Sequence, residues 1–217
     1  MYSPSQHAET DVRVLHSLIR AHPLGTWATQ GDGELIVNHV PFLLDQSRGD
    51  LGTLVGHVAR ANDVWRTHSR TVPSAVIFQG AETYISPSWY PSKHAHGKAV
   101  PTWNYAVVHA HGLPQIIEDK EWLLEHLNKL TDTHETGQKL PWKVSDAPTE
   151  YLDRMIGAIV GVEIRIAKLV GKWKVSQNRP EPDKLGVVAG LLSKGDEQSR
   201  EMAALVDQFI KPRESRG

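Results

Sequence analysis

The chain has 217 residues, of which 40% are hydrophobic and 23% charged, and its formal net charge is −1. This is the composition of a globular protein that can bury a full core, and the near-zero charge excludes a global field that attracts DNA or a membrane. The absence of cysteine excludes disulfides, thiolate nucleophiles and cysteine-ligated metal sites, and it fits a cytoplasmic protein.

The N-terminal region predicts a helix. Residues 8–22 carry apolar side chains at helical spacing, Thr10 or Asp11 can cap the start, and Pro23 stops the helix. No basic segment followed by an apolar run precedes it, so we expect no signal peptide. No window of the chain approaches 18 consecutive apolar residues, so we also expect no membrane span.

Most of the chain then predicts strands separated by turn residues. A turn is expected at Gly31–Gly33 and another at Gly80, and residues 60–68 form a polar link or a single helical turn. Both faces of the second strand are largely apolar, which indicates cover on both sides, while Pro41 favours a sheet edge or a bulge. The predicted strands are 24–30, 34–46, 51–58, 73–80, 82–87, 99–112, 112–119 and 161–173.

Helices are expected between and after these strands. Asp119 caps a helix that runs to about Glu135, and residues 145–159 form another, with Asp146 as cap and Pro148 in the first turn. A surface helix follows from Asp183, and residues 211–217 are expected to fray. Strands joined by hairpins, with helices between and after them, predict an α+β, mainly β fold: an antiparallel barrel with α elements. No G-x-G-x-x-G opens a helix, so a dinucleotide-binding fold is not expected.

The stretch from Tyr84 to Gly112 combines aromatic rings with hydroxyl and basic groups. Five aromatic residues fall between Tyr84 and Tyr105, out of the 7 Trp, 5 Tyr and 3 Phe of the chain. Each ring alone is more simply a core residue, but together with the serines, Thr102 and Lys98 they indicate a flat, partly apolar, anionic ligand. Arg60, in the segment HVARAN, can bind a phosphate bidentately, although an isolated arginine is more often a solvated loop residue.

A second dense segment, GKWKVSQNR over residues 171–179, packs cations, amides and an aromatic ring together. It could face DNA, complete the ligand site in the same chain or across a dimer, or be a solvated tail. We favour the ligand site, because the segment follows the last strand directly and the amides of Gln177 and Asn178 suit the polar edge of a heterocycle.

Histidines suggest a metal. His94 and His96, and likewise His109 and His111, are two residues apart, so on a strand each pair would share a face and could chelate a metal. No nearby pair of carboxylates completes a coordination set, and solvated histidines are the simpler interpretation. Haem ligation by one histidine is a further alternative. No G-x-S-x-G elbow indicates a hydrolase.

Several blocks, in order over residues 1 to about 190, carry a resemblance to a known family. They include VNHVPFLLD, LGTLVGHVARAN, FQGAETYISPSWYPSK, GKAVPTWNYAVVHAHG and GKWKVSQNR. The chain resembles the PaiB family, described as FMN-binding negative transcriptional regulators. The resemblance implies a split β-barrel of the pyridoxamine-phosphate-oxidase-like kind over 1–180, with a C-terminal helical extension over 181–217. It also implies a homodimer with flavin sites at the subunit interface.

The resemblance also implies site residues. The phosphate-side groups are Arg60, Ser86, Lys98 and Thr102, and the ring-side groups are Trp89, Val100, Trp103 and Asn104. Gln177 and Arg179 are expected to come from the partner subunit. The remaining flavin-binding candidates are His57, Asn62 and Ser88. The segment SKHAHGK carries histidines outside the family pattern.

Three functions follow as hypotheses. The first is a cytoplasmic, FMN-binding dimer that represses transcription, directly or indirectly; the sequence shows no confident helix-turn-helix. The second is a flavin-dependent oxidoreductase that uses NAD(P)H on a small molecule, with His57 or Tyr90 as a candidate general acid. The third is a haem protein built on the same barrel.

Overall fold

The computed structural model describes residues 1–31 and 33–210, without the side chains of His94 and His96. The chain forms two compact units, each assembled from separate segments. The first unit combines Met1–Leu18, Gln79–Val108 and the chain from Val170 onwards, and the second combines Ile19–Phe78 and His109–Leu169. The division at residue 180 suggested by the sequence stays a prediction.

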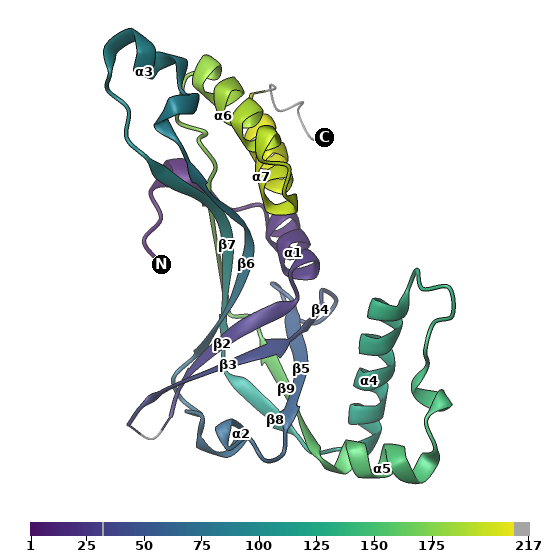
Figure 1. The fold of residues 1–217 in the computed structure, drawn as a ribbon. Coiled ribbons are helices and arrows are strands. Elements are labelled where there is room, and N and C mark those ends of the chain that lie inside the picture. Colours follow the sequence, from purple (N-terminus) through teal and green to yellow (C-terminus); the bar gives the residue numbers. More distant parts are fainter. Residues whose placement is uncertain (32, 211–217) are drawn as a thin grey trace. The chain divides into compact units, whose positions relative to one another are not determined.

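The second unit contains two groups of antiparallel strands (Figure 1). In one, β3 pairs with β2 along its whole length, from Leu24 opposite Pro41 to Gln30 opposite Leu35, and β2 also pairs with β6. In the other, the strand order is β4-β5-β9-β8. The bounds are Leu24–Gln30 (β2), Leu35–Pro41 (β3), Leu43–Asp45 (β4), Thr53–Ala59 (β5), Ser74–Ile85 (β6), Pro114–Ile117 (β8) and Ile159–Arg165 (β9).

Phe42 occupies the core of the second unit. It is 1% exposed, and its ring lies edge-on to that of Phe78, with centroids 6.4 Å apart. Gly56 on β5 lies against this ring, and a Cβ at that position would be 2.9 Å from Cδ1 of Phe42, so only glycine fits there. Burial of aromatic rings of this size supplies much of the stability of such a core.

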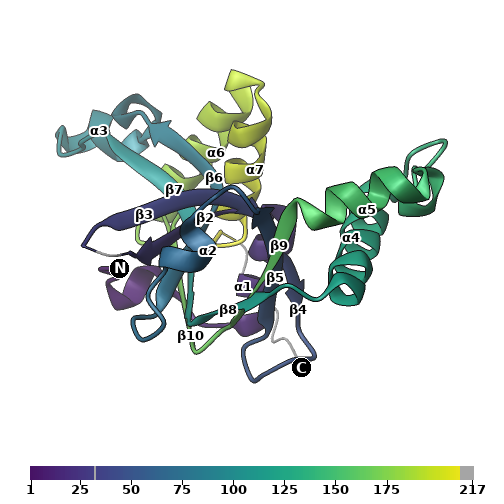
Figure 2. The same cartoon turned by 90° about the horizontal axis from the view of Figure 1, so that it is seen from below.

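The helices of the second unit are short except for one. They are α2 (Val64–Thr67), α4 (Lys120–Glu135) and α5 (Thr149–Gly157), and α4 and α5 lie side by side in both views (Figures 1 and 2). The predicted cap of α4 is confirmed, because the amide of Trp122 donates to Oδ1 of Asp119 over 2.7 Å. The predicted cap of α5 is wrong: Pro148 is its N-cap, while Asp146 accepts from the amide of Lys143.

The first unit has the strand order β1-β10-β7-β6, flanked by helices. The strands are Ala8–Glu9 (β1), Lys168–Lys174 (β10), Thr102–Gly112 (β7) and the second half of β6, and Ala8 of β1 lies opposite Lys172 of β10. The helices are α1 (Val12–Ala21), α3 (Pro91–His96), α6 (Glu181–Lys194) and α7 (Glu197–Asp207), with 3-10 turns over Ser5–His7 and Pro87–Trp89.

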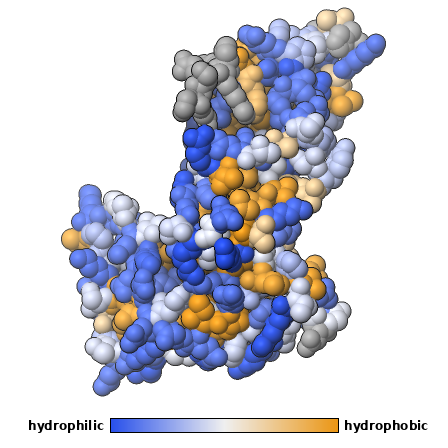
Figure 3. Space-filling view, turned by 180° about the vertical axis from the view of Figure 1, so that it is seen from behind, coloured by the Kyte–Doolittle hydropathy of each residue, from blue (hydrophilic) through white to orange (hydrophobic). Residues whose placement is uncertain are grey.

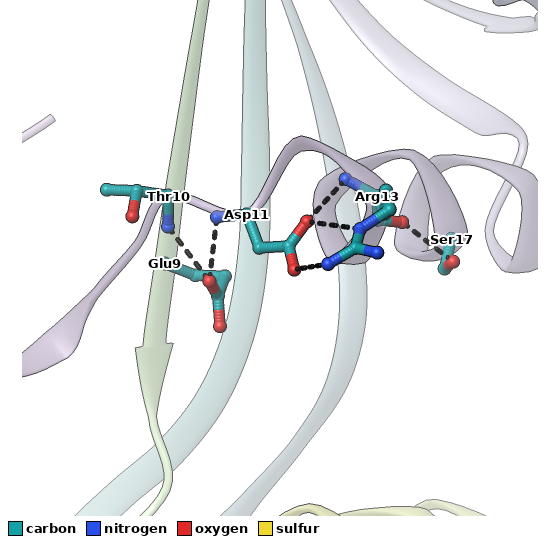
Figure 4. Close-up of polar contacts among 5 residues, drawn as sticks. All are labelled: Glu9, Thr10, Asp11, Arg13 and Ser17. Carbon is teal, nitrogen blue, oxygen red and sulfur yellow. Dashed lines mark hydrogen bonds and ion pairs between the residues drawn. The ribbon is translucent and has the colours of Figure 1, made fainter. Parts of the chain in front are cut away.

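The start of α1 confirms one predicted cap. Oδ1 of Asp11 accepts from the amide of Arg13 over 2.9 Å, and the Arg13 guanidinium folds back onto the same carboxylate (Figure 4). Oε1 of Glu9 accepts from the amides of Thr10 and Asp11, each over 2.9 Å. The helix therefore begins later than residue 8, because Ala8 and Glu9 are held in β1.

Several predicted boundaries are wrong. The segment 34–46 forms two strands, β3 and β4, which belong to different sheets. Gly80 is not a turn: β6 runs through it, and a Cβ there would lie 3.0 Å from Leu18, so the glycine allows close approach. The segment 161–173 forms two strands, β9 and β10, that pair with different partners. The C-terminal helix is broken at Gly195, whose φ of 77° ends α6, and residues 211–217 lie outside the described chain.

The second strand of the predicted hairpin is also more open than expected. Leu35 and Val37 of β3 are 67% and 50% exposed, so the strand is not covered on both faces. The edge position inferred from Pro41 is confirmed, since β3 ends its strand order. Figure 3 shows apolar patches on a face that is otherwise mostly hydrophilic. Among the described residues, no helix combines the length and apolar character needed to cross a membrane.

Candidate functional site

The predicted flavin-binding residues divide between the two units. His57, Arg60 and Asn62 lie in the second unit, and all the others lie in the first. In the first unit they lie in the 3-10 turn after β6 and the residue before it, in the loop between α3 and β7, at the start of β7, and in the segment after β10.

Two of the predicted hydroxyl groups in the first unit accept from lysine ammonium groups. Nζ of Lys93 donates to Oγ of Ser88 over 3.3 Å, and Nζ of Lys174 donates to Oγ1 of Thr102. Ser86 accepts from the amide of Ser88 and so fixes the 3-10 turn that presents these groups. An ammonium beside a hydroxyl is a suitable pair for a phosphate oxygen, and the sequence had suggested Thr102 and Ser88 but not Lys93.

Apolar and aromatic groups beside these pairs are open to solvent. Trp103 on β7 is 54% exposed and lies edge-on to Tyr84 of β6, with ring centroids 6.3 Å apart and an interplanar angle of 74°. Val100, just before β7, is 66% exposed, and Lys98 is also exposed. An exposed indole provides a surface on which a planar ring can stack.

Trp89 packs within the first unit, and its role beside the flavin ring stays a prediction. Its ring lies against α6, where a Cβ at Gly190 would be 2.3 Å from Cδ2 of Trp89. Next to it, the amide and hydroxyl of Ser92 donate to the buried carboxylate of Asp183 over 3.0 and 2.7 Å. The C-terminal helix α6 therefore holds in place the loop that carries Ser86, Ser88 and Lys93.

Arg179 also works from within the first unit. Its guanidinium lies 4.7 Å from the ring centroid of Tyr90, which is fully buried. Burial raises the pKa of Tyr90, so this phenol keeps its proton at neutral pH.

The two predicted amides are engaged in internal hydrogen bonds. Asn104 is 1% exposed and donates to Oγ of Ser176 over 3.0 Å. Gln177 accepts from the amide of Val175 over 2.9 Å and donates to the carbonyl of Gln6 over 3.0 Å. Ser176 has a φ of 60°, the left-handed region that is strained for most residues. In this structure the amides stabilise the turn after β10.

In the second unit, Arg60 ties secondary-structure elements together. It donates to Glu118 over 2.6 Å and to the carbonyls of Gly157 and Ile159 over 2.9 and 3.2 Å. Asn62 accepts from the amide of Val64 over 3.0 Å at the start of α2 and donates to Asn38 over 2.7 Å. Both side chains already have partners, so their role as phosphate ligands stays a prediction.

His57 belongs to a buried network that the sequence did not indicate. Its Nδ1 lies 3.0 Å from Nε2 of His126, whose ring stacks on Trp122 at a centroid distance of 5.4 Å. Burial lowers the pKa of His57 and lowers that of His126 to about 4, so both imidazoles are neutral at pH 7. Indole Nε1 of Trp122 donates in turn to Glu163 over 3.0 Å.

Glu163 ends this network at a partly buried ion pair. Arg48 binds its carboxylate bidentately, Nη1 to Oε1 over 2.6 Å and Nη2 to Oε2 over 2.5 Å. Hydrogen bonds from Arg48 lower the pKa of Glu163, which therefore stays ionised. Because Arg48 lies 115 positions before Glu163, no local pattern could have revealed the pair.

The histidine pairs form no metal centre in the part of the chain that the structure describes. The rings of His109 and His111 lie 6.2 Å apart and are tilted by 53°. Across residues 1–31 and 33–210, no group of three or more histidine and carboxylate side chains is placed to hold a metal ion. The side chains of His94 and His96 lie outside the described part.

The first unit fits an FMN molecule by the chemistry of its donors. A flavin needs cations and hydroxyls for the phosphate and an apolar or aromatic face for the ring. The pairs Lys93–Ser88 and Lys174–Thr102 supply cations and hydroxyls, and the exposed ring of Trp103 supplies an aromatic face.

Comparison with known proteins agrees with this chemistry. Residues 1–168 match the family described as "Putative FMN-binding domain". The chain is 30% identical to "Protease synthase and sporulation protein PAI 2" of Bacillus subtilis, with 97% of this chain and 99% of that protein covered. It is 33% identical to an uncharacterized protein of Emericella nidulans, with 95% and 96% covered.

Solved structures support the fold. The FAD and heme binding protein from Mycobacterium smegmatis is similar, with a TM-score of 0.57 and 18% sequence identity, over 77% of this chain and 73% of that one. The flavocytochrome Anf3 from Azotobacter vinelandii has a TM-score of 0.56 and 15% identity, over 77% and 69%. These similarities confirm the predicted antiparallel, split-barrel type of fold with flanking helices. The described strands form open sheets.

Proposed function

The chain belongs to the PaiB-like family of FMN-binding proteins, and from this premise we propose that it is a homodimeric flavin-dependent regulator that lowers transcription in the cytoplasm. FMN is the cofactor that the family match over residues 1–168 supports. The regulatory role draws on the Bacillus relative, whose name refers to protease synthesis and sporulation and which aligns with 97% of this chain.

The observation that carries the proposal is the presence, in the first unit, of two ammonium–hydroxyl pairs and an exposed indole. Lys93 with Ser88 and Lys174 with Thr102 would hold the phosphate, and Trp103 would pack against the ring. When bound, the flavin supplies reversible two-electron chemistry or a planar surface that changes with its redox state. The protein's own groups bind and orient it.

The first test separates the phosphate from the ring. Flavin fluorescence is titrated with protein, once with FMN and once with riboflavin, which has no phosphate. We expect Lys174→Met and Lys93→Met each to weaken FMN binding by about tenfold, the scale of one charge-assisted hydrogen bond, and to leave riboflavin binding unchanged. Equal affinity of the wild-type protein for both flavins, or no change in the fluorescence of either, would contradict the assignment.

Lys194 offers a matched control. Its ammonium donates to Oγ1 of Thr83 over 2.9 Å, in the same unit and in the same kind of pair, but neither residue belongs to the predicted site. Lys194→Met should therefore leave both titrations unchanged. A loss as large as that of Lys174→Met would mean that net charge, not a defined phosphate site, governs binding.

The regulatory part is tested by gel shift. The formal net charge of −1 predicts weak direct DNA binding, so a repressor of this kind would act through a local basic patch or through another protein. Direct binding must release counterions, so the logarithm of the affinity falls with the logarithm of salt concentration. A retarded complex without that salt dependence, or no complex with either flavin redox state, would exclude direct repression.

Self-association is supported by exposed apolar side chains at a sheet edge. Leu24 on β2 is 61% exposed, and Leu35 and Val37 on β3 are 67% and 50% exposed. An unpaired edge strand with such residues favours pairing with another chain. Sedimentation at several concentrations should show a dimer, and Val37→Lys should shift it toward the monomer.

A further inference from the structure

The second unit contains a cavity of about 750 Å³ between α4 and the strands β4, β5 and β9. Cavities of roughly 300–1,000 Å³ with mainly apolar walls are typical of small-molecule sites. Every residue that lines it belongs to the second unit. Its apolar wall is formed chiefly by Phe42, Leu43, Leu44, Val55 and the ring of Trp122.

The charges around the cavity are balanced. Three basic and three acidic side chains line it, and the acidic ones already have donors. Glu163 is bound bidentately by Arg48, Glu125 accepts from Lys129 over 2.5 Å, and Asp45 accepts from the amide of Ser47. An ion that entered the cavity would compete with these pairs, and the cost is largest at Glu163, whose side chain is 7% exposed and is bound by Arg48. The lining therefore favours a neutral molecule.

One polar group in the lining has no partner. His126 is 3% exposed; its Nε2 is bonded to His57, but its Nδ1 has no hydrogen-bond partner within the described chain. A buried polar atom of this kind is normally satisfied. Stacking on Trp122 fixes the plane of the imidazole, with an interplanar angle of 21°. The ring is thus preorganised, and its one unused hydrogen-bonding atom is buried in a residue that lines the cavity.

The His57–His126 pair can adapt to its ligand. If His57 donates to Nε2 of His126, the proton of His126 lies on Nδ1, which is then a donor. If His126 donates from Nε2, its Nδ1 is an acceptor. Burial lowers the pKa of both rings, so neither carries a charge at neutral pH.

We propose that this cavity is a second small-molecule site, which binds an uncharged, flat aromatic compound through stacking in the apolar wall and one hydrogen bond to His126. The site is separate from the flavin residues of the first unit and does not depend on the function proposed above. FMN itself is a poor occupant, because its phosphate is anionic and the cations that line the cavity include Arg48 and Lys129, which already hold carboxylates.

The test uses three probes of the same shape and different charge: benzamide, benzoate and benzylamine. Each is titrated into the full chain, and backbone amide shifts are followed by two-dimensional NMR. We expect benzamide to shift amides of α4 and β5 and to bind at least about tenfold more tightly than either ion, which must be desolvated. No shifts in α4 and β5, or equal binding of benzoate, would overturn the proposal.

Variants locate the hydrogen bond. His126→Phe keeps an aromatic ring and removes both nitrogens, so it should weaken benzamide binding by about fivefold, as expected for one neutral hydrogen bond. His39→Phe is the matched control, since His39 is exposed on β3 and does not line the cavity. Unchanged affinity in His126→Phe would refute the role of His126.

A bulky substitution in the wall and a competition with FMN test where benzamide binds. Val55→Phe adds bulk to the wall and should abolish benzamide shifts even if His126→Phe folds poorly; binding that survives this change would place the probe elsewhere. Addition of FMN should leave benzamide bound. Displacement of benzamide by FMN would identify the cavity as the flavin site and overturn the proposal.

Discussion

Gly190 in the middle of α6 offers a sharp test of how this helix supports the loop that carries Ser86 and Ser88. Glycine is a poor helix former, so Gly190→Ala by propensity alone should stabilise the protein by about 1 kcal/mol. The structure predicts the opposite. The new Cβ would lie 2.3 Å from Cδ2 of Trp89 and 2.5 Å from both Cε2 and Cγ, so the indole or the helix must move.

The steric cost of the added Cβ is larger than the gain in helix propensity. Overpacking of a buried contact costs about 1–3 kcal/mol, so we expect a net loss of about 1 kcal/mol. In a chain of this length that corresponds to a fall in Tm of about 2–4 °C. Gly186→Ala should cost more, because its Cβ would lie 2.0 Å from the carbonyl oxygen of Trp89, which cannot rotate away as a side chain can.

Thermal and urea unfolding measure the effect. Gly157→Ala in α5 is the control, because a Cβ there has no atom within 4 Å, and it should be neutral or stabilising. Trp89→Leu provides the second half of a double-mutant cycle: in that background Gly190→Ala should become stabilising. If Gly190→Ala raises Tm as much as Gly157→Ala does, Trp89 does not pack on α6 as described, and the reasoning fails.

Three further changes separate structural from ligand roles. Hydrogen bonds from Arg48 hold the pKa of Glu163 below its ordinary value of 4.5, so its contribution to stability is complete above that pH and is lost as the pH falls through the lower, folded-state pKa. Glu163→Gln should reduce the fall of the urea unfolding midpoint at acid pH. An unchanged pH dependence of the midpoint would refute the ion pair. Arg60→Met should cost about 1–2 kcal/mol through lost bonds to two backbone carbonyls, with the preference for FMN over riboflavin retained; loss of that preference would make Arg60 a phosphate ligand after all. Asn104→Ala, which leaves the Ser176 hydroxyl without its buried donor, should cost about 1–2 kcal/mol in urea unfolding and leave flavin affinity unchanged.

Local chemistry made several elements predictable. The caps at Asp11 and Asp119 can be read from the sequence, because a carboxylate before an amphipathic run satisfies free amides at a helix start. The hairpin of β2 and β3 follows from alternating residues around a glycine turn. The turn predicted at Gly80 was wrong because the sequence does not distinguish a glycine inside a strand from a glycine in a turn. Only the close approach of Leu18 in the structure explains this glycine.

The candidate site was less predictable for a related reason. Thr102 and Ser88 were identified by their residue type, and each proves to have a lysine beside it. Asn104 and Gln177 have equally suitable chemistry, but their amides make hydrogen bonds inside the protein. These bonds surround Ser176, whose φ of 60° no sequence pattern predicts. The network from His57 to Arg48 joins residues far apart in the chain, which periodicity cannot reveal.

The interleaving of the two units has a practical consequence for anyone who wishes to produce part of this protein. The chain passes from one unit to the other within α1, β6, β7 and β10, and neither unit is a continuous piece of sequence. The family match ends at residue 168, where β10 begins. A fragment cut at that boundary would remove the pairing partner of β1 together with α6, and would leave the indole of Trp89 in water. The recombinant unit of this protein is therefore the whole chain, and a failed truncation would say nothing against flavin binding.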